Sequence, residues 1–272
     1  MALGDPSKGK DGWLYRRSIL LAGEQTIGQI DYGGESQREW IRVDVPGAGC
    51  EWVQDWEAMV KGLQALDAQL RRVDLALTTF DGSVTHERVV MAHQEGLFSS
   101  GGRNPKRRDI TGSDPRDGRT AYIGARDGAK YVRCYEKGFE LLRKCGIPEN
   151  LRYGCTHIHY NGVGKVPVEH LYRVEVEFKD VDKVLPYTML TDRDAYFAGA
   201  NPFCASLIPG APERKVMGLP DFNPRAALAV QLEHCRRAYG AIIRTAILAH
   251  GDERVVMAMI AGDEPSKRLI AE

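Results

Sequence analysis

The sequence has no long hydrophobic run and no excess of either charge. Its longest apolar stretch near the N-terminus, residues 18–22, is far shorter than the roughly 18 apolar residues that a membrane span needs, and no signal-cleavage pattern follows it. We therefore expect neither membrane insertion nor export. The 37 Lys and Arg residues balance 37 Asp and Glu residues, so the field of the whole protein favours no class of partner.

Cysteine is scarce, and its spacing argues against two kinds of site. The chain has six cysteines and no C-x-x-C pair, which disfavours a zinc site and a disulfide framework and favours reduced, packed thiols. This predicts a cytoplasmic location. Residues 162–165 lack the spacing of a phosphate-binding P-loop. A content of 43% hydrophobic and 27% charged residues does not suggest a disordered or fibrous chain.

The patterns that are present predict an α+β fold in which the order hairpin, helix, strand, helix occurs twice. For the first run we expect strands at 13–22, 26–32 and 39–45, a helix at 56–69, a strand at 72–77 and a helix at 85–95. For the second run we expect a hairpin of 119–124 and 130–135, a helix at 138–144, a strand at 172–178 and a helical stretch at 182–197. Residues 101–117, between the runs, are rich in Gly, Pro and charge and predict a long loop.

This repetition predicts two related halves, residues 13–98 and 118–200, each an antiparallel sheet with helices packed on one face. The halves could join their sheets about a pseudo-twofold axis, within one domain of residues 1–205.

The remainder, residues 206–272, is expected to form a helical C-terminal appendage. Prolines between 202 and 220 predict an irregular connector. Asn223-Pro224 is a good start for a long helix that extends to about residue 250. A final helix or strand is expected at 254–261.

A basic segment lies between residues 101 and 133. It holds nine Lys and Arg residues against four Asp and Glu residues and leads into a predicted strand. Such a segment is typical of a nucleic-acid-binding surface, although a solvated loop can carry the same charges. The candidates for DNA contact are Arg103, Lys106, Arg107, Arg108, Arg119, Arg126 and Lys130.

The strand that follows places a phenol between two cations. Alternation puts Tyr131, Arg133 and Tyr135 on one strand face, and Lys137 follows. A phenol has a pKa of about 10, so it is a poor nucleophile unless positive charge or a metal ion stabilises the phenolate. Arg133 and Lys137 are placed to do so and could also hold a phosphate under attack. The alternative is an ordinary strand with a solvated polar face.

Carboxylates in two similar strands have two interpretations. Asp74 follows Arg72 by two residues, and Glu175 follows Arg173 in the same way. Each pair therefore shares a strand face and can form a salt bridge. Carboxylates on adjacent central strands can instead bind Mg²⁺ or Mn²⁺, which prefer oxygen ligands. The residues alone leave both interpretations open.

His157-Ile158-His159 also has two interpretations. Two histidines on either side of an apolar residue can hold a divalent metal on a strand face. The pattern is only three residues long, however, and the third histidine, His170, is loosely placed. We favour histidines of a loop or hairpin over metal ligands.

Several segments together resemble a known family. They are Arg72-Val-Asp-Leu-Ala-Leu77 with Phe80-Asp-Gly82, Gly96 to Lys106, Thr120 to Arg126, Arg133-Cys-Tyr-Glu-Lys-Gly138, Tyr172 to Lys179 and Tyr196 to Ala200. In this order they resemble the Rep_trans replication initiators, most of all the branch of filamentous phages and prophages, over about residues 13–205. The resemblance implies a site-specific and strand-specific nickase for rolling-circle replication, with a tyrosine that becomes linked to a 5′-phosphate and a divalent metal.

The family's R-x-Y-x-K motif falls on residues 133–137. The resemblance therefore implies Tyr135 as the nucleophile, with Arg133 and Lys137 as phosphate ligands. Tyr131 lies on the same strand face and could substitute for Tyr135.

The resemblance also implies Asp74, Glu175 and Asp81 as ligands of Mg or Mn. The chain departs from the family pattern at one point. Relatives commonly have acidic residues where this chain has Thr78-Thr79, so one metal carboxylate is in doubt.

The function predicted from these features is that of a replication initiator that nicks origin DNA and leaves a 5′-phosphotyrosine link and a free 3′-hydroxyl. The resemblance implies double-stranded and single-stranded origin DNA and host proteins such as a helicase as partners. It also implies the cytoplasm of a bacterial host and a gene of phage, prophage or plasmid origin, and it allows a homodimer. Two rival functions are a non-catalytic DNA-binding regulator on the same fold and a metal-independent RNA-binding protein.

Overall fold

The computed structural model of the chain describes residues 1–21, 25–37, 40–100, 102–114, 117–146, 154–160, 162–181, 183–217 and 224–261. The chain divides into two compact units. The first comprises Met1–Val181 with Leu185–Val216, and the second comprises residues 217–272 with the short stretch 182–184. The functional limits 1–205 and 206–272 stay a prediction.

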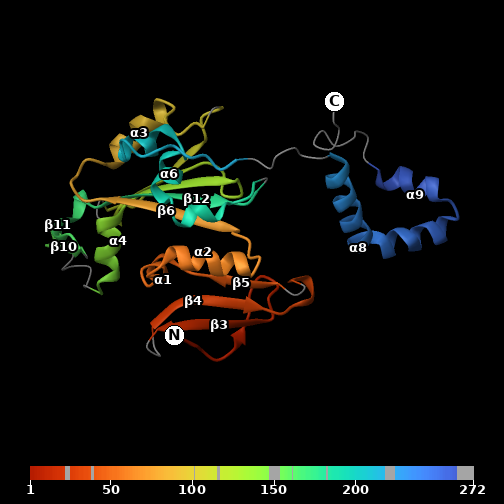
Figure 1. The fold of residues 1–272 in the computed structure, drawn as a ribbon. Coiled ribbons are helices and arrows are strands. Elements are labelled where there is room, and N and C mark those ends of the chain that lie inside the picture. The colour runs from red at the N-terminus through yellow and green to blue at the C-terminus, as the bar shows by residue number, and fades with distance from the viewer. Residues whose placement is uncertain are drawn as a thin grey trace. The chain divides into compact units, whose positions relative to one another are not determined.

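A five-stranded antiparallel sheet forms the centre of the first unit (Figure 1), with the strand order β6-β12-β9-β8-β7. The strands are β6 (Arg72–Thr79), β12 (Tyr172–Lys179), β9 (Lys130–Glu136), β8 (Arg119–Ile123) and β7 (Arg107–Thr111). The apolar residues of its inner strands alternate with polar ones, so they gather on one face. Residues of α3 (His86–Gln94) and α6 (Arg193–Ala198) join these side chains in one core, and both helices lie over that face in Figure 1.

The opposite side of this sheet is called the polar face here. Register places its side chains on neighbouring strands directly across from one another. They include Asp74, Thr78, Arg108, Thr120, Tyr122, Tyr131, Arg133, Tyr135, Arg173, Glu175 and Glu177.

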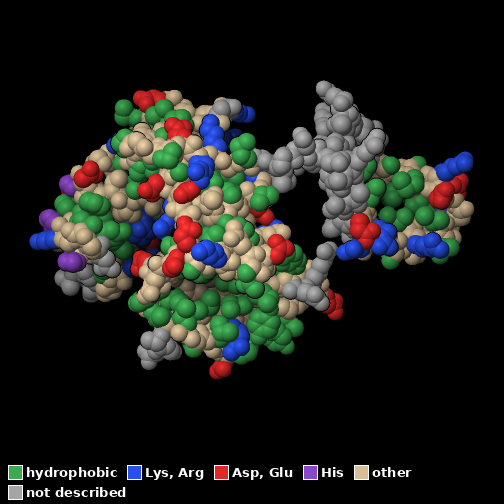
Figure 2. Space-filling model, viewed as in Figure 1, with side chains coloured by type: hydrophobic (Ala, Val, Ile, Leu, Met, Phe, Trp, Pro, Cys, Tyr) green, Lys and Arg blue, Asp and Glu red, His purple; other side chains and the backbone are tan. Residues whose placement is uncertain are grey.

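A second sheet is formed near the N-terminus by β1 (Ala2–Leu3), β2 (Ser7–Lys8), β3 (Tyr15–Leu21), β4 (Gln25–Tyr32) and β5 (Ile41–Asp44). The Asp31 side chain is only 1% exposed because Arg16 and Arg42 on the neighbouring strands both bind it, at 2.6 and 2.7 Å. On the edge strand β5, by contrast, Ile41 and Val43 are 63% and 59% exposed. Figure 2 shows hydrophobic side chains gathered over this part of the molecule.

Most of the elements expected from the sequence are confirmed. Helix α2 (Trp56–Ala65) is capped by Asp55, whose side chain accepts a hydrogen bond from the Ala58 amide. Helix α3 is capped in the same way by Thr85. The predicted hairpin of 119–124 and 130–135 is the β8-β9 pair. The remaining elements of this unit are η1 (Glu35–Gln37), α1 (Gly47–Cys50), α4 (Lys137–Lys144), β10 (His157–Tyr160), β11 (Gly164–Pro167), η3 (Val168–His170), η4 (Tyr187–Leu190) and α7 (Pro202–Leu207).

Three expectations were wrong in part. Residues 101–117 are not all loop, because they include β7 at the edge of the central sheet. An edge strand has one neighbour and mostly exposed side chains, so its sequence need not alternate. In place of one helical stretch over 182–197, the described residues form the short η4 and then α6, whose last residue is Ala198. The connector from 202 to 220 begins with α7, which Asn201 caps.

The predicted duplication agrees with one feature of the structure and differs from it in another. The two similar strands β6 and β12 are antiparallel neighbours, as a pseudo-twofold axis between halves requires. The hairpin of the first half, however, belongs to the separate N-terminal sheet, whereas that of the second half is in the central sheet. Duplication therefore stays a prediction.

The second unit contains the predicted C-terminal helices α8 (Pro224–His250) and α9 (Glu253–Ile260). Asp252 caps α9 by accepting a hydrogen bond from the Arg254 amide at 2.8 Å. None of the helices in the described parts of the chain is long and apolar enough to span a lipid bilayer.

Candidate active site

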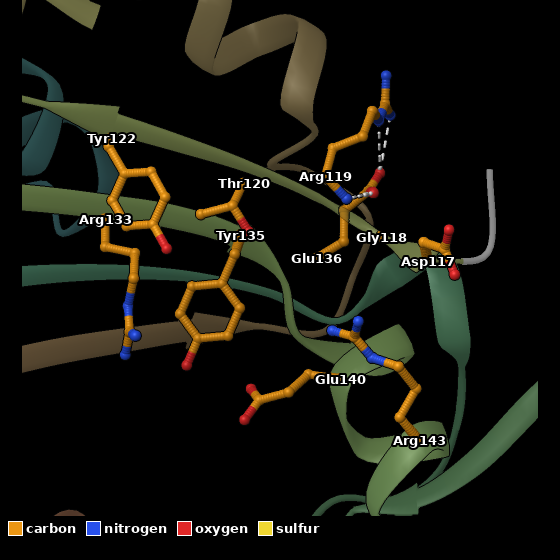
Figure 3. A pocket seen from close by; sticks show the side chains of 10 residues that line it. All are labelled: Asp117, Gly118, Arg119, Thr120, Tyr122, Arg133, Tyr135, Glu136, Glu140 and Arg143. Carbon is orange, nitrogen blue, oxygen red and sulfur yellow. Dashed lines mark hydrogen bonds and ion pairs between the residues drawn. The ribbon is translucent and has the colours of Figure 1, made fainter. Parts of the chain in front are cut away.

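Tyr135 lies on the polar face near the end of β9, where the strand passes directly into α4. Its side chain points to the same side of the sheet as Tyr122 and Arg133 (Figure 3). The guanidinium carbon of Arg133 lies 4.9 Å from the centre of the Tyr135 ring, and the Lys137 ammonium nitrogen lies 5.6 Å from it. The predicted arrangement of a phenol between two cations is therefore present.

Arg173 is a third cation at this site, and the sequence interpretation did not include it. It lies on β12 directly across from Tyr135. Its Nε donates to Thr78 Oγ1 at 2.8 Å, and its Nη2 donates to the Tyr160 hydroxyl at 3.2 Å. Thr78 occupies one of the two positions where the family resemblance led us to expect an acidic residue. In this chain it instead accepts a hydrogen bond from Arg173. Strand alternation in the sequence predicted that Arg173 and Glu175 share a face. That Arg173 lies next to Tyr135 follows from the pairing of β12 with β9, which the sequence did not predict.

Carboxylates accompany the two cations that flank the phenol in sequence. Arg133 Nη2 lies 2.7 and 2.9 Å from the two carboxylate oxygens of Glu175. Lys137 Nζ lies 2.7 Å from Glu140 Oε2. Burial raises the pKa of Glu140, but its ion pairs with Lys137 and Lys144 outweigh that effect and lower the pKa to about 2. The site is therefore a network of paired charges.

The phenol itself is harder to ionise than a free tyrosine. Tyr135 is 8% exposed, and this burial raises its pKa to about 12. Arg173 and Arg133 act in the opposite direction, while Glu140 and Glu175 add to the increase. The cations therefore do not activate the phenol in the protein alone, because burial, with a smaller contribution from the nearby carboxylates, outweighs them.

A cavity of about 230 Å³ lies beside Tyr135. Its lining residues are Asp117, Gly118, Arg119, Thr120, Tyr122, Arg133, Tyr135, Glu136, Glu140 and Arg143 (Figure 3). Arg143 adds a basic side chain from α4 at this cavity. The cavity thus combines the phenol with basic groups that can bind a phosphate oxygen.

Of the three predicted metal-binding carboxylates, two lie on adjacent strands and the third lies outside the sheet. Asp74 and Glu175 lie on the adjacent strands β6 and β12 and on the face of Tyr135. Asp74 is directly across from Glu177, and Arg72 binds both carboxylates. Asp81 lies beyond the end of β6, where its Oδ1 accepts a hydrogen bond from the Ser83 amide at 3.0 Å.

These carboxylates do not fit a preformed metal site. Asp74 and Glu175 are each held by an arginine, which already supplies the positive charge that a cation would supply. Across the described parts of the chain, no three His, Cys, Asp or Glu side chains are grouped as ligands of one ion. The salt-bridge interpretation is therefore confirmed for Arg72 and Asp74. It was wrong for Arg173 and Glu175, because Glu175 pairs with Arg133 on the neighbouring strand.

The histidines of β10 point away from the contact that this hairpin makes with the polar face. Tyr160 reaches Arg173, and strand alternation puts His157 and His159 on the opposite side of β10 from Tyr160. Both histidines are exposed. This geometry favours the interpretation as hairpin histidines.

The predicted DNA contacts separate into two groups. Four of them are exposed, namely Arg103, Lys106, Arg108 and Arg126. Three are bound to groups within the protein, namely Arg107 to Asp109, Arg119 to Glu87 and Glu136, and Lys130 to Ser100 and the Ala200 carbonyl. Only Arg108 of the seven lies on the polar face by register.

Comparison with known proteins identifies the family. No curated protein matches the chain. The solved structure of a rolling-circle replication initiator protein from Geobacillus stearothermophilus is 19% identical, with a TM-score of 0.47, over 71% of this chain and 68% of that chain. The Rep_trans family, described as replication initiation factor, matches residues 68–215, more than half of the 272 residues. The chain therefore belongs to the Rep_trans family of replication initiation factors.

Proposed function

We propose that this replication initiation factor nicks origin DNA by transesterification, with Tyr135 as the nucleophile. The observation that carries the proposal is the position of the phenol on the polar face, with Arg133, Arg173 and Lys137 around it. Tyr131 is a weaker candidate, because its ring stacks on Tyr122 at 5.7 Å between centroids. The family supports DNA as the substrate.

In the proposed reaction the Tyr135 oxygen attacks the scissile phosphorus. A bond forms between that oxygen and phosphorus, and the bond from phosphorus to the 3′-oxygen breaks. The phenolic proton leaves to solvent, and the 3′-oxygen takes up a proton to become a free hydroxyl. Charge on the phosphoryl oxygens is stabilised by the arginines, since phosphoryl transfer depends mainly on positioning and electrostatics.

Because the cations are paired with carboxylates, binding of the substrate phosphate can itself activate the Tyr135 phenol. A phosphate at the cavity competes with Glu175 for Arg133 and with Glu140 for Lys137. The arginine fork suits a phosphate as well as it suits a carboxylate. Once these carboxylates are displaced, the cations can stabilise the phenolate, which lowers the pKa of Tyr135 relative to the free protein.

The test is transfer of label from DNA to protein. Wild type, Tyr131→Phe and Tyr135→Phe are incubated with a labelled single-stranded origin oligonucleotide, with and without Mn²⁺. A covalently labelled protein band is expected from wild type and Tyr131→Phe and not from Tyr135→Phe, which keeps the ring but lacks the attacking oxygen. A band that persists in Tyr135→Phe and disappears in Tyr131→Phe would assign the reaction to Tyr131.

A DNA-binding regulator without turnover is the second candidate. The raised pKa of Tyr135 favours it, because a protonated phenol is a poor nucleophile. This candidate predicts origin binding by wild type but no labelled band, with or without Mn²⁺, and equal binding by Tyr135→Phe.

A further inference from the structure

Two tyrosines on the polar face form a stacked pair beside the candidate active site. Tyr122 of β8 and Tyr131 of β9 have ring centroids 5.7 Å apart and an interplanar angle of 16°. Both residues are only partly buried. The proposed reaction uses neither ring.

Positive charge accompanies the pair. The guanidinium carbon of the exposed Arg108 lies 5.4 Å from the centre of the Tyr122 ring. Burial raises the pKa of Tyr131, and the positive charges of Arg108 and Arg126 act in the opposite direction. Stacked rings flanked by arginines are the combination that binds single-stranded nucleic acid, because bases stack on the rings while cations attract phosphates.

The pair adjoins the place where the scissile phosphate would bind. Tyr122 lies directly across from Arg133 in register, and it lines the same cavity as Tyr135. A nucleotide chain whose phosphate is at Tyr135 therefore has its adjoining bases within reach of Tyr122 and Tyr131.

We propose that Tyr122 and Tyr131 form a stacking platform for bases of single-stranded DNA next to the scissile phosphate. This inference rests on the proposed nicking function and specifies the form of its substrate. Bases in an intact duplex are stacked on each other and present no free face to the tyrosines. The platform therefore selects DNA that is already unpaired at the nick site.

The experiment compares the double variant Tyr122→Leu/Tyr131→Leu with wild type by fluorescence anisotropy on a labelled single-stranded origin oligonucleotide and on the same sequence as a duplex. Loss of stacking is expected to weaken single-strand binding about 5-fold or more for each base lost. Duplex binding should stay unchanged. The slope of affinity against salt should also stay unchanged, because a neutral ring neutralises no phosphate.

The N-terminal sheet offers a matched control. Tyr15 and Tyr32 are also neighbours, with centroids 5.4 Å apart, but their rings are tilted by 31°. Tyr15→Leu/Tyr32→Leu should bind single-stranded DNA like wild type. Tyr122→Phe/Tyr131→Phe keeps both rings and should also bind like wild type. Thermal melting of each variant separates a loss of binding from a loss of folding.

The outcomes distinguish the platform from the nicking proposal. Single-strand affinity equal to wild type in the double leucine variant would overturn the platform, as would an equal loss on duplex or in the control pair. An abasic nucleotide next to the nick should weaken binding to wild type and have no further effect in the double leucine variant. If that pattern appears while wild type forms no covalent band, the platform stands and the nicking proposal fails.

Discussion

At the scale of single residues, the Glu140 carboxylate adds to the effect of burial in raising the pKa of the candidate nucleophile. Burial is the main cause of the high pKa of Tyr135, and the Glu140 carboxylate adds to it while also pairing with Lys137. Below a pKa of about 12 the phenolate fraction rises about tenfold for each pH unit. The rate of single-turnover cleavage by wild type should therefore rise with pH across the neutral and mildly alkaline range.

Glu140→Gln should move this profile to lower pH. The change removes a negative charge near the phenolate and releases Lys137, so both effects lower the pKa of Tyr135. Cleavage at pH 8 should increase about tenfold for each unit by which the pKa falls. Glu87→Gln is the matched control, because Glu87 also has a pKa lowered to about 2 but pairs with Arg119 on the other side of the sheet. A slower Glu140→Gln enzyme would mean that Glu140 assists the reaction.

At the scale of elements, strand alternation was sufficient to predict which side chains share a face. It placed Tyr131, Arg133 and Tyr135 together, and the structure shows them on the polar face. It could not show that β12 lies between β6 and β9, since that order depends on packing among distant segments. The pairing of Arg173 with Tyr135 was therefore missed.

Charge counting was less informative than alternation. The nine cations of residues 101–133 predicted a single basic surface. In the structure, β7 and β8 are neighbours, and alternation along them turns Arg107 and Arg119 to the helix-covered side and Arg108 to the polar face. Because residues 101–117 were predicted to be a loop, no strand face could be assigned to Arg107 or Arg108 from the sequence.

The N-terminal sheet depends on the ion pairs of Asp31. Asp31→Asn should lower the free energy of unfolding by about 2 to 3 kcal/mol, less than the roughly 3 to 5 kcal/mol for a fully buried pair, because Arg16 and Arg42 keep contact with water. The hydrogen bond from Arg16 is the main cause of the lowered pKa of Asp31. The stabilisation is thus complete above the unfolded pKa and is lost as pH falls through the lower folded pKa.

Urea unfolding at neutral and acidic pH measures this effect. The difference between wild type and Asp31→Asn should shrink as the pH falls, because wild type loses its ion pairs. Asp44→Asn, an exposed position in the same sheet, serves as the control and should change stability little. An equal cost at acidic pH would show that packing, and not charge, accounts for the contribution of Asp31.

At the scale of the whole molecule, zero net charge means that DNA affinity must come from local groups. The total of 37 basic residues says little, because many of them are paired with carboxylates. Arg108 and Arg126 are exposed, and we expect them to neutralise phosphates of DNA bound at the proposed tyrosine platform.

Arg108→Gln and Arg126→Gln should each reduce the slope of log affinity against log salt by about one, because each removes one phosphate contact. Arg107→Gln is the internal control. It lies in the same basic segment, but its guanidinium donates to Asp109 and to the Val90 carbonyl at 2.9 and 3.2 Å, so its loss should lower stability and leave the slope unchanged. Equal slopes for all three variants would mean that local charge density, and not the face of the strand, determines which cations bind DNA.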